Sequence, residues 1–183
     1  MLCAGIFYAY VISDTHGLVR PCILQIFQEC DLIIHAGDIG KPVVLDLLKE
    51  IAPVVAVRGN IDKGDWAEDI PLTGIVKIEN RYLYVLHDLG SLDLDPKTSE
   101  FHVIISGHSH KPAEYQRNGV LYLNPGSAGP GRFNLPVCAA LMEIDGDSVN
   151  ISFINLLDIP NNVPREDDFL GEIRLLKQLM GET

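Results

Sequence analysis

The sequence predicts an α/β protein built from two stacked, mixed β-sheets, a β-sandwich, with helices on the outside. Three observations predict it. The first 60 residues alternate short β-rich runs with helical patterns, an order typical of a parallel sheet with right-handed crossovers. From residue 73 onward the β-rich runs follow one another as hairpins, which indicates antiparallel strands. With 183 residues in all, we expect residues 1–183 to form a single domain with a sizeable core.

In the first third of the chain, three strands are expected to alternate with two helices. Both helices begin at a proline, Pro21 and Pro42. Proline is favoured in the first turn of a helix, because its missing N–H would have no helical partner there. We therefore expect strands at residues 5–12, 31–35 and 53–57, and helices at residues 21–30 and 42–50.

The rest of the chain is expected to form three hairpins and one single strand. Asn118-Gly119 is the strongest short signal, because this pair is favoured in two-residue hairpin turns. The expected strand pairs are 73–78 with 82–86, 113–117 with 120–123, and 137–144 with 149–154; residues 103–106 form a single strand. Residues 166–180 carry apolar side chains on one side of a helix, and we expect this helix to dock on the core rather than bind a partner.

Charge and composition exclude several classes of function. Fourteen Lys and Arg against 25 Asp and Glu give a formal net charge of −11. This balance argues against sequence-independent nucleic-acid binding and against docking on anionic membranes. No apolar run approaches the roughly 20 residues of a membrane-spanning helix. The four cysteines show no CxxC spacing, so we expect free thiols in a reducing compartment and place the protein in the cytoplasm.

Polar residues of the types that bind metals stand directly after five of the expected strands. In open α/β sheets, ligands bind beyond the carboxyl ends of the strands, so these side chains are expected to meet. Each short pattern alone is weak, because Gly-Asp and Gly-Asn often form turns and a single histidine is usually structural. Together and in order they predict a metal site formed by Asp14, His16, Asp38, Asn60, His87, His108 and His110.

The ordered set of Asp-x-His, Gly-Asp, Gly-Asn, a lone His and Gly-His-x-His resembles the calcineurin-like metallophosphoesterase superfamily. The length is similar to that of its small bacterial and archaeal phosphodiesterases, and the resemblance covers Ser13 to about Arg132. It implies an αββα sandwich, in agreement with the pattern above. It also implies that one metal is held by Asp14, His16, Asp38 and His110, and a second by Asp38, Asn60, His87 and His108, with Asp38 bridging.

Such a site is suited to phosphate ester hydrolysis. Two divalent ions about 3.5–4 Å apart clamp a phosphoryl group and lower the pKa of a shared water. Mixed nitrogen and oxygen ligands suit transition metals; manganese is our first choice, with nickel, iron, cobalt and zinc as alternatives. Two ions bring four positive charges, while Asp14, Asp38 and a bridging hydroxide return three, which leaves one positive charge for the phosphate. We expect a phosphodiesterase that hydrolyses small phosphodiesters by attack of that hydroxide, with Asp38, Asn60 and His87 as catalytic residues.

Three features depart from the pattern of the family. In its protein-phosphatase members a histidine that can protonate the leaving group follows the Gly-Asn pair, but here Ile61-Asp62 follow, so any general acid is unidentified. Asp88 stands after His87, where glycine is usual, and adds a carboxylate near the metals. The segment between His87 and His102 leaves little room for a specificity lid.

Four further residues are candidates for contacts with the substrate phosphate: Arg58, Asn124, Ser127 and Arg132. A guanidinium matches the geometry of phosphate, although Arg58 has the alternative of pairing with an acidic neighbour. The loop that contains Asn124 and Ser127 has the alternative of being ordinary turn chemistry. His35 is expected to be a buried structural histidine, with support of the site as its minor role.

The alternative function is a non-catalytic interaction module on the same fold, as in the metallophosphoesterase-like subunit of the retromer coat. That use typically goes with eroded metal ligands, whereas all seven positions are intact here. The expected partner is therefore a small phosphodiester substrate, with no nucleic acid and no membrane. A homodimer is an open alternative for the oligomeric state.

Overall fold

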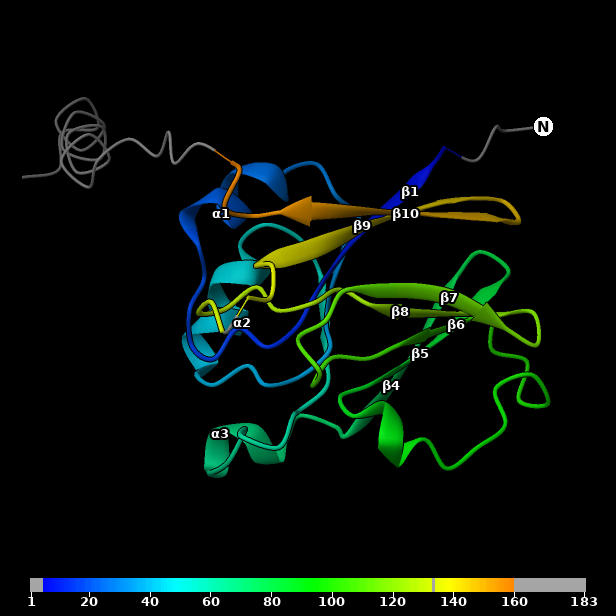
Figure 1. Cartoon of the computed structure of the whole chain (residues 1–183), viewed down its shortest axis with the longest axis horizontal. Coiled ribbons are helices and arrows are strands. Elements are labelled where there is room, and N and C mark those ends of the chain that lie inside the picture. The colour runs from blue at the N-terminus through cyan, green and yellow to red at the C-terminus, as the bar shows by residue number, and fades with distance from the viewer. Residues whose placement is uncertain (1–4, 133, 160–183) are drawn as a thin grey trace, which may run out of the picture.

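Two five-stranded β-sheets lie face to face in the computed structural model, which describes residues 5–132 and 134–159 (Figure 1). The first sheet contains β1 (Phe7–Ile12), β2 (Leu32–His35), β3 (Val54–Ala56), β9 (Cys138–Asp145) and β10 (Ser148–Asn155), in the order β10-β9-β1-β2-β3. The second contains β4 (Thr73–Ile78), β5 (Arg81–Leu86), β6 (Val103–Ile105), β7 (Ala113–Arg117) and β8 (Val120–Asn124), in the order β4-β5-β6-β8-β7. The predicted pair of stacked, mixed sheets is confirmed.

The first sheet begins as the parallel unit that the sequence predicts. β1 pairs in parallel with β2, and β2 with β3. The crossovers carry α1 (Pro21–Ile26) and α2 (Pro42–Lys49), each with proline in its first turn. α1 is shorter than the expected 21–30, because the chain turns back at Glu29, which takes left-handed backbone with φ of 61°. All four residues of β2 are buried, because the helices cover one face and the second sheet covers the other.

The three expected hairpins are present, and one strand is inserted between two of them. β4 pairs with β5, β7 with β8, and β9 with β10, all antiparallel. Asn118 and Gly119 both take positive φ, 54° and 82°, as their two-residue turn requires. β6 lies between β5 and β8 and is parallel to both. Two short elements were not expected: α3 (Asp65–Glu68) and the 3-10 turn η1 (Leu89–Ser91) are too brief for a periodic signal.

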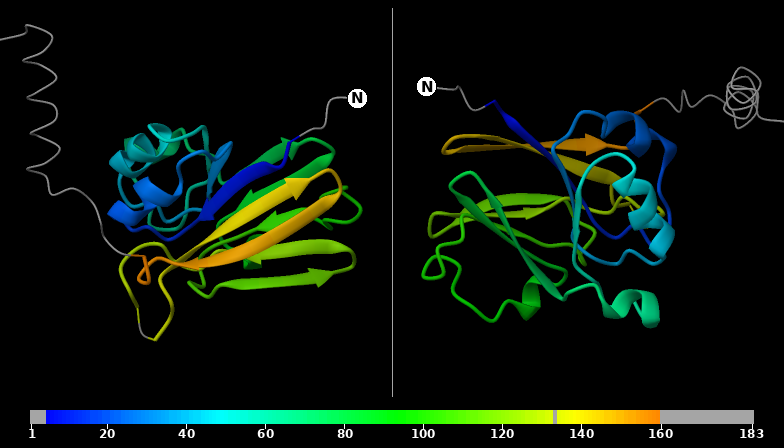
Figure 2. Two further views of the ribbon diagram at one scale, coloured as in Figure 1. Left: turned by 90° about the horizontal axis from the view of Figure 1, so that it is seen from above. Right: turned by 180° about the vertical axis from the view of Figure 1, so that it is seen from behind.

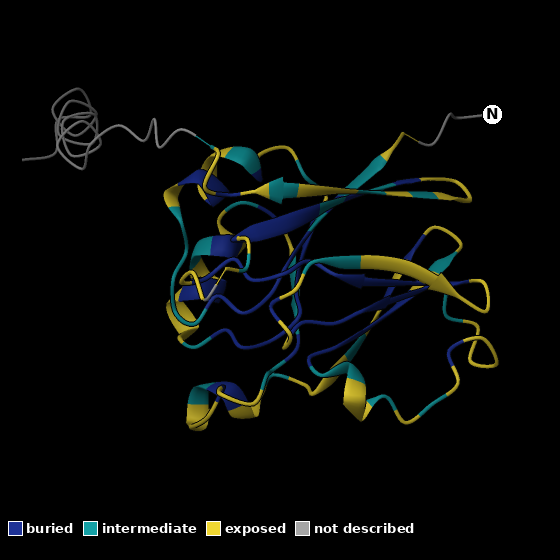
Figure 3. Cartoon of the chain, in the orientation of Figure 1, coloured by how far each residue is buried: buried dark blue, intermediate teal, exposed yellow. Residues whose placement is uncertain are grey.

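Three apolar layers hold the sandwich together. Figure 2 shows the helices and the two sheets from two further sides. The central layer lies between the two sheets and is completely buried at Val11 and Ile105. The second packs α1 and α2 on the outer face of the first sheet, where Phe27 stacks on Tyr10 with 4.0 Å between ring centroids. The third lies on the outer face of the second sheet, where the segment 89–101 covers it in place of a long helix. Figure 3 shows that β9 is largely buried, whereas β7 and β10, at the edges of the two sheets, are partly or fully exposed along their length.

The expected C-terminal helix at 166–180 lies outside the described residues. Among the helices that are described, none has the length and apolar character needed to cross a membrane. Cys22, Cys30 and Cys138 are free thiols, as expected.

Candidate metal centre

The seven predicted ligands come together where β1, β2, β3, β5 and β6 end. Backbone hydrogen bonds join the loops that follow these strands: Asp14 N–H donates to the Gly37 carbonyl at 2.9 Å, and Gly107 N–H donates to the His87 carbonyl at 2.9 Å. The two sheets are linked by the His108 N–H, which donates to Asp14 Oδ2 at 3.1 Å. Residues up to 96 positions apart in the sequence, Asp14 and His110, therefore meet in one place.

The backbone of the site is held in uncommon conformations. In the described part of the chain nine non-glycine residues take positive φ, and five of these nine are predicted ligands: Asp14, His16, Asp38, His108 and His110, with φ between 49° and 66°. This conformation is disfavoured for residues with a side chain, and such strain clusters at functional sites. The strain is therefore concentrated where the predicted chemistry lies.

Two of the glycines that precede ligands are required by close packing. A Cβ on Gly37 would lie 2.6 Å from His87 Nδ1, and a Cβ on Gly59 would lie 2.0 Å from Asp38 Oδ1. Real Cβ atoms essentially never approach other atoms so closely. In both Gly-Asp and Gly-Asn, the glycine thus lets a neighbouring ligand pass against the backbone.

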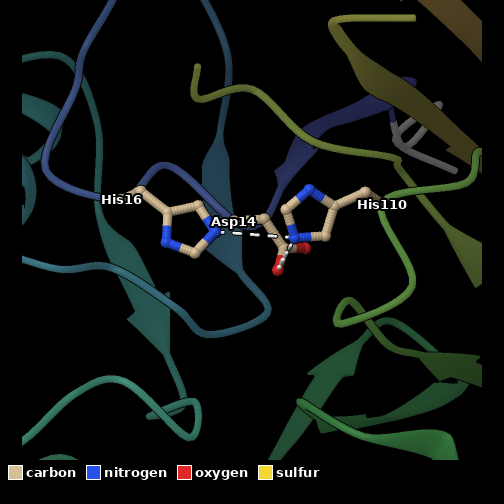
Figure 4. Close-up of side chains that lie close together, drawn as sticks. All are labelled: Asp14, His16 and His110. Atoms are coloured by element: carbon tan, nitrogen blue, oxygen red, sulfur yellow. Dashed lines mark hydrogen bonds and ion pairs between the residues drawn. The ribbon is translucent and has the colours of Figure 1, made fainter. Parts of the chain in front are cut away.

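One group of side chains surrounds Asp14 (Figure 4). Ligand atoms of Asp14, His16 and His110 all lie within 4.8 Å of one another. His110 Nε2 lies 3.2 Å from Asp14 Oδ1 and 3.5 Å from His16 Nε2, and His16 Nε2 lies 4.0 Å from Asp38 Oδ2. Asp14 is completely buried, and its Oδ1 has no hydrogen-bond partner in the part of the chain that is described. A buried carboxylate oxygen that accepts no hydrogen bond and lies beside two imidazoles fits a divalent cation.

The remaining ligands form a second group around Asn60 Oδ1. His87 Nε2 and His108 Nδ1 each lie 3.2 Å from this amide oxygen, and His87 Nε2 also lies 3.2 Å from Asp38 Oδ1. Asp38 thus presents one oxygen to each group. His87 Nδ1 lies 2.8 Å from the Ala36 carbonyl oxygen, which can only accept, so Nδ1 carries the hydrogen and Nε2 is left as a ligand atom.

The electrostatics of the site depend on burial and on the pairing of its own groups. Burial raises the pKa of Asp14. Burial first, and the positive charge of Arg132 second, lower the pKa of His16. Burial alone would raise the pKa of Asp38, but hydrogen bonds from His87 and a backbone N–H bring it below its usual value. For His87 burial acts in the opposite direction, and the bond to Asp38 raises the pKa. A cation bound here would have to displace that proton.

Asp62 positions the two loops that carry Asp38 and Asn60, a role that sequence reasoning missed. Its buried carboxylate accepts hydrogen bonds from Ile39 N–H at 3.1 Å and from Gly40 N–H and Gly59 N–H, both at 2.7 Å. The sequence does not reveal which backbone N–H groups will need a side-chain acceptor. The only signal for Asp62 was therefore its place directly after Gly59-Asn60-Ile61.

His35 is completely buried, as expected, and supports the first loop. Its Nδ1 accepts from Gly37 N–H at 3.2 Å, so Nε2 carries the hydrogen and donates to Thr15 Oγ1 at 2.9 Å. Thr15 Oγ1 in turn donates to the Ile39 carbonyl at 3.0 Å. Burial lowers the pKa of His35 to about 3, which keeps the ring neutral in this chain of bonds.

The four candidates for phosphate contacts fall into two pairs. Arg58 lines a pocket together with the second ligand group, and no carboxylate of the described residues forms an ion pair with it. Arg132 is exposed and acts on the pKa of His16. Asn124 and Ser127 are buried, and their polar atoms form hydrogen bonds with neighbouring loops. These bonds differ from the expected contacts with the phosphate. Asn124 Nδ2 donates to the Gly107 carbonyl at 2.6 Å, and Ser127 Oγ donates to the Asp14 carbonyl at 3.0 Å.

Asp88, the residue that departs from the family pattern, is the cap of η1. Its Oδ1 accepts from Gly90 N–H at 2.9 Å. The cap starts the segment 89–101, which was expected to leave little room for a specificity lid. Residues 91 and 93 of this segment nevertheless form part of the wall of the pocket that contains Arg58.

Comparison with known proteins agrees with this geometry. Residues 9–147 match the calcineurin-like phosphoesterase superfamily domain. The chain is 30% identical over 159 residues to a probable metallophosphoesterase of Methanothermobacter thermautotrophicus, across 79% of this chain and 90% of that protein. It is 31% identical over 162 residues to the phosphodiesterase YfcE of Escherichia coli K12, across 75% and 88%. Its fold is similar to that of zinc-complexed Vps29 from Entamoeba histolytica, with a TM-score of 0.65 and 22% identity across 82% and 99%. The extent of the domain match and the identity to these relatives show that the chain belongs to the calcineurin-like phosphoesterase superfamily.

Proposed function

We propose that the chain is a metal-dependent phosphodiesterase that hydrolyses small phosphodiesters directly, with two divalent ions held by the seven residues of the candidate centre. The observation that carries the proposal is the convergence of two carboxylates, an amide oxygen and four imidazoles, with a buried Asp14 oxygen that accepts no hydrogen bond from the described residues. When bound, the ions would neutralise the charge of the phosphate and lower the pKa of a water molecule. Manganese is our first choice, because mixed nitrogen and oxygen donors suit it.

The chain's own residues would bind and orient. We assign catalytic roles to Asp38, which offers an oxygen to each ligand group, and to Asn60 and His87, which adjoin it. Arg58 and Arg132 are the proposed phosphate contacts, because Arg58 lines the pocket that contains the second ligand group and the charge of Arg132 acts on His16. Asn124 and Ser127 become positioning residues, because they tie the loops of Gly107 and Asp14 together.

The experiment compares metal content and turnover in one set of variants. Protein stripped with a chelator and reloaded with Mn²⁺ is expected to bind two ions and to hydrolyse bis-p-nitrophenyl phosphate. Asp38→Ala is expected to bind fewer ions and to lose turnover, because both groups lose a ligand. Asp46→Ala, an exposed position on α2, is the matched control. Unchanged turnover in Asp38→Ala would refute the bridging role.

The pH dependence provides a further check. Activity is expected to fall in acid, because the ligand histidines must be neutral to bind metal and the raised pKa of His87 makes its proton compete at higher pH. A rate that stays constant down to pH 4 would contradict the proposal.

A non-catalytic scaffold is the second candidate, because the fold is similar to that of Vps29. The complete ligand set favours the enzyme over the scaffold. Protein that binds metal yet shows no turnover on diesters, monoesters or cyclic nucleotides would favour the scaffold instead. Strong cleavage of nucleic acid would contradict the expectation, drawn from the charge of −11, that nucleic acid is not a partner. A cytoplasmic location and a homodimer stay predictions.

A further inference from the structure

A pocket of about 540 Å³ opens directly beside the second ligand group. It lies against the outer face of the second sheet, next to β4 and β5, and is bounded by the segment that follows His87. Three predicted ligands, Asn60, His87 and His108, are among the residues that line it. A smaller recess of about 300 Å³ contains only His108 of the ligand set. Of these two spaces, the first pocket offers more room for an ester group attached to a phosphate at the candidate centre.

The lining of this pocket is mixed. It contains one cation among the described residues, Arg58, which directly precedes Gly59-Asn60 in the chain. Its apolar part consists of Leu86 and Tyr84, which are buried in the sheet, and Leu72, which directly precedes β4 and is 62% exposed. Tyr84 is fixed by Phe101, with 5.0 Å between ring centroids. These walls suit an apolar or aromatic group.

Two carboxylates also line this pocket. Asp88 and Asp93 line it from the segment that follows His87, and the polar residues that accompany them, Thr73 and Ser91, are uncharged. Arg58 is the single cationic side chain among the described lining residues, and its proposed role is to contact the phosphate. A second negative charge on the substrate would therefore meet two carboxylates, and no further cation of the described lining residues would offset it.

We propose that this pocket binds one ester group of the substrate and selects for an uncharged, apolar group over an anionic one. The proposal rests on the proposed phosphodiesterase function. It narrows the substrate class to phosphate esters of uncharged alcohols with an apolar or aromatic body. It assigns Asp93 and Leu72 as specificity-determining residues: Asp93 excludes a second anion, and Leu72 packs against the body of the ester group.

The charge part is tested with two symmetrical diesters, bis-p-nitrophenyl phosphate and bis(p-carboxyphenyl) phosphate, so that either ester group presents the same chemistry. The Mn²⁺-loaded wild type is expected to prefer the uncharged diester. Asp93→Asn is expected to reduce that preference in kcat/KM by roughly three- to tenfold, the effect of one partly screened like charge within several ångströms. Asp95→Asn is the matched control, because Asp95 lies two residues further along the same segment and does not line this pocket.

The apolar part is tested with Leu72→Ser. We expect kcat/KM to fall by about three- to tenfold for bis-p-nitrophenyl phosphate, because part of an apolar contact is lost. Leu157→Ser is the control, because Leu157 is also 62% exposed but does not line the pocket.

Calorimetry of the same proteins separates this proposal from the proposed function. Phenylphosphonate and p-carboxyphenylphosphonate are not diesters and report binding without turnover. Weaker binding of the carboxylated ligand to wild type, recovered in Asp93→Asn, supports the pocket even where turnover is absent. Turnover with no change of preference in Asp93→Asn, and equal effects of Leu72→Ser and Leu157→Ser, would overturn the pocket while leaving the phosphodiesterase intact.

Discussion

Replacing the Asp62 carboxylate with an amide tests whether this residue holds the site together. The carboxylate accepts three backbone hydrogen bonds at 2.7–3.1 Å. An asparagine oxygen in place of Oδ2 can keep the bonds from Ile39 and Gly59, but its NH2 group then faces the Gly40 N–H. One bond to a charged acceptor, worth about 1.5–3 kcal/mol, is lost, and the other two become weaker neutral bonds. We expect Asp62→Asn to lower the free energy of unfolding by about 3 kcal/mol.

The assay is urea unfolding followed by circular dichroism at pH 7, with a chelator present so that metal binding does not contribute. Asp65→Asn is the control, because Asp65 is exposed and its substitution should change stability by less than about 0.5 kcal/mol. Mn²⁺ affinity, measured by calorimetry, is expected to fall about tenfold or more in Asp62→Asn, because the loops of Asp38 and Asn60 lose their support. Equal stability of the two variants, together with wild-type Mn²⁺ affinity, would refute this reasoning.

Three further predictions concern single positions. His35 has a pKa of about 3 in the folded chain and about 6.5 in the unfolded chain. Between these two values only the unfolded chain gains the proton, so the free energy of unfolding decreases as the pH is lowered, by about 2 kcal/mol from pH 7 to pH 5. Chelator-treated His35→Gln should lack this part of the slope in urea unfolding, and an identical slope would contradict the assignment. Gly59→Ala should weaken Mn²⁺ binding at least tenfold by displacing Asp38, whereas Gly74→Ala, whose Cβ would make ordinary contact at 3.5 Å, should leave it unchanged. Gly119→Ala places a side chain at φ of 82° in open space, so unfolding should become easier by about 1 kcal/mol with metal binding intact; a loss of metal binding would show that the hairpin matters to the site.

Much of the fold was predictable, because its signals are local. Apolar runs that end in Asp14, Asp38 and Asn60 mark three strands of one sheet, and the proline at the start of each crossover helix marks where the helix begins. Asn118-Gly119 predicts its hairpin because few other pairs accept positive φ at both turn positions. The predicted end of α1 at residue 30 was wrong, because the turn at residue 29 leaves no clear pattern in the sequence.

The candidate ligands were predictable for a similar reason. A residue directly after a strand is placed by that strand, so parallel neighbours deliver their following residues to one edge. Supporting residues lack this advantage. Asp62 matters because three backbone N–H groups from two separate loops point at it, and Asn124 because its amide reaches the loop of Gly107.

By itself the sequence determined the order of strands and helices, the hairpin turns and which seven side chains would meet, because these follow from short-range periodicity and from the direction of each strand. Only the tertiary structure decided how the two sheets stack, where β6 inserts and which walls surround the pocket. These features depend on contacts between segments far apart in the chain. No sequence pattern links Leu72, Tyr84 and Asp93. They line one pocket because the second sheet and the segment that covers it bring them together.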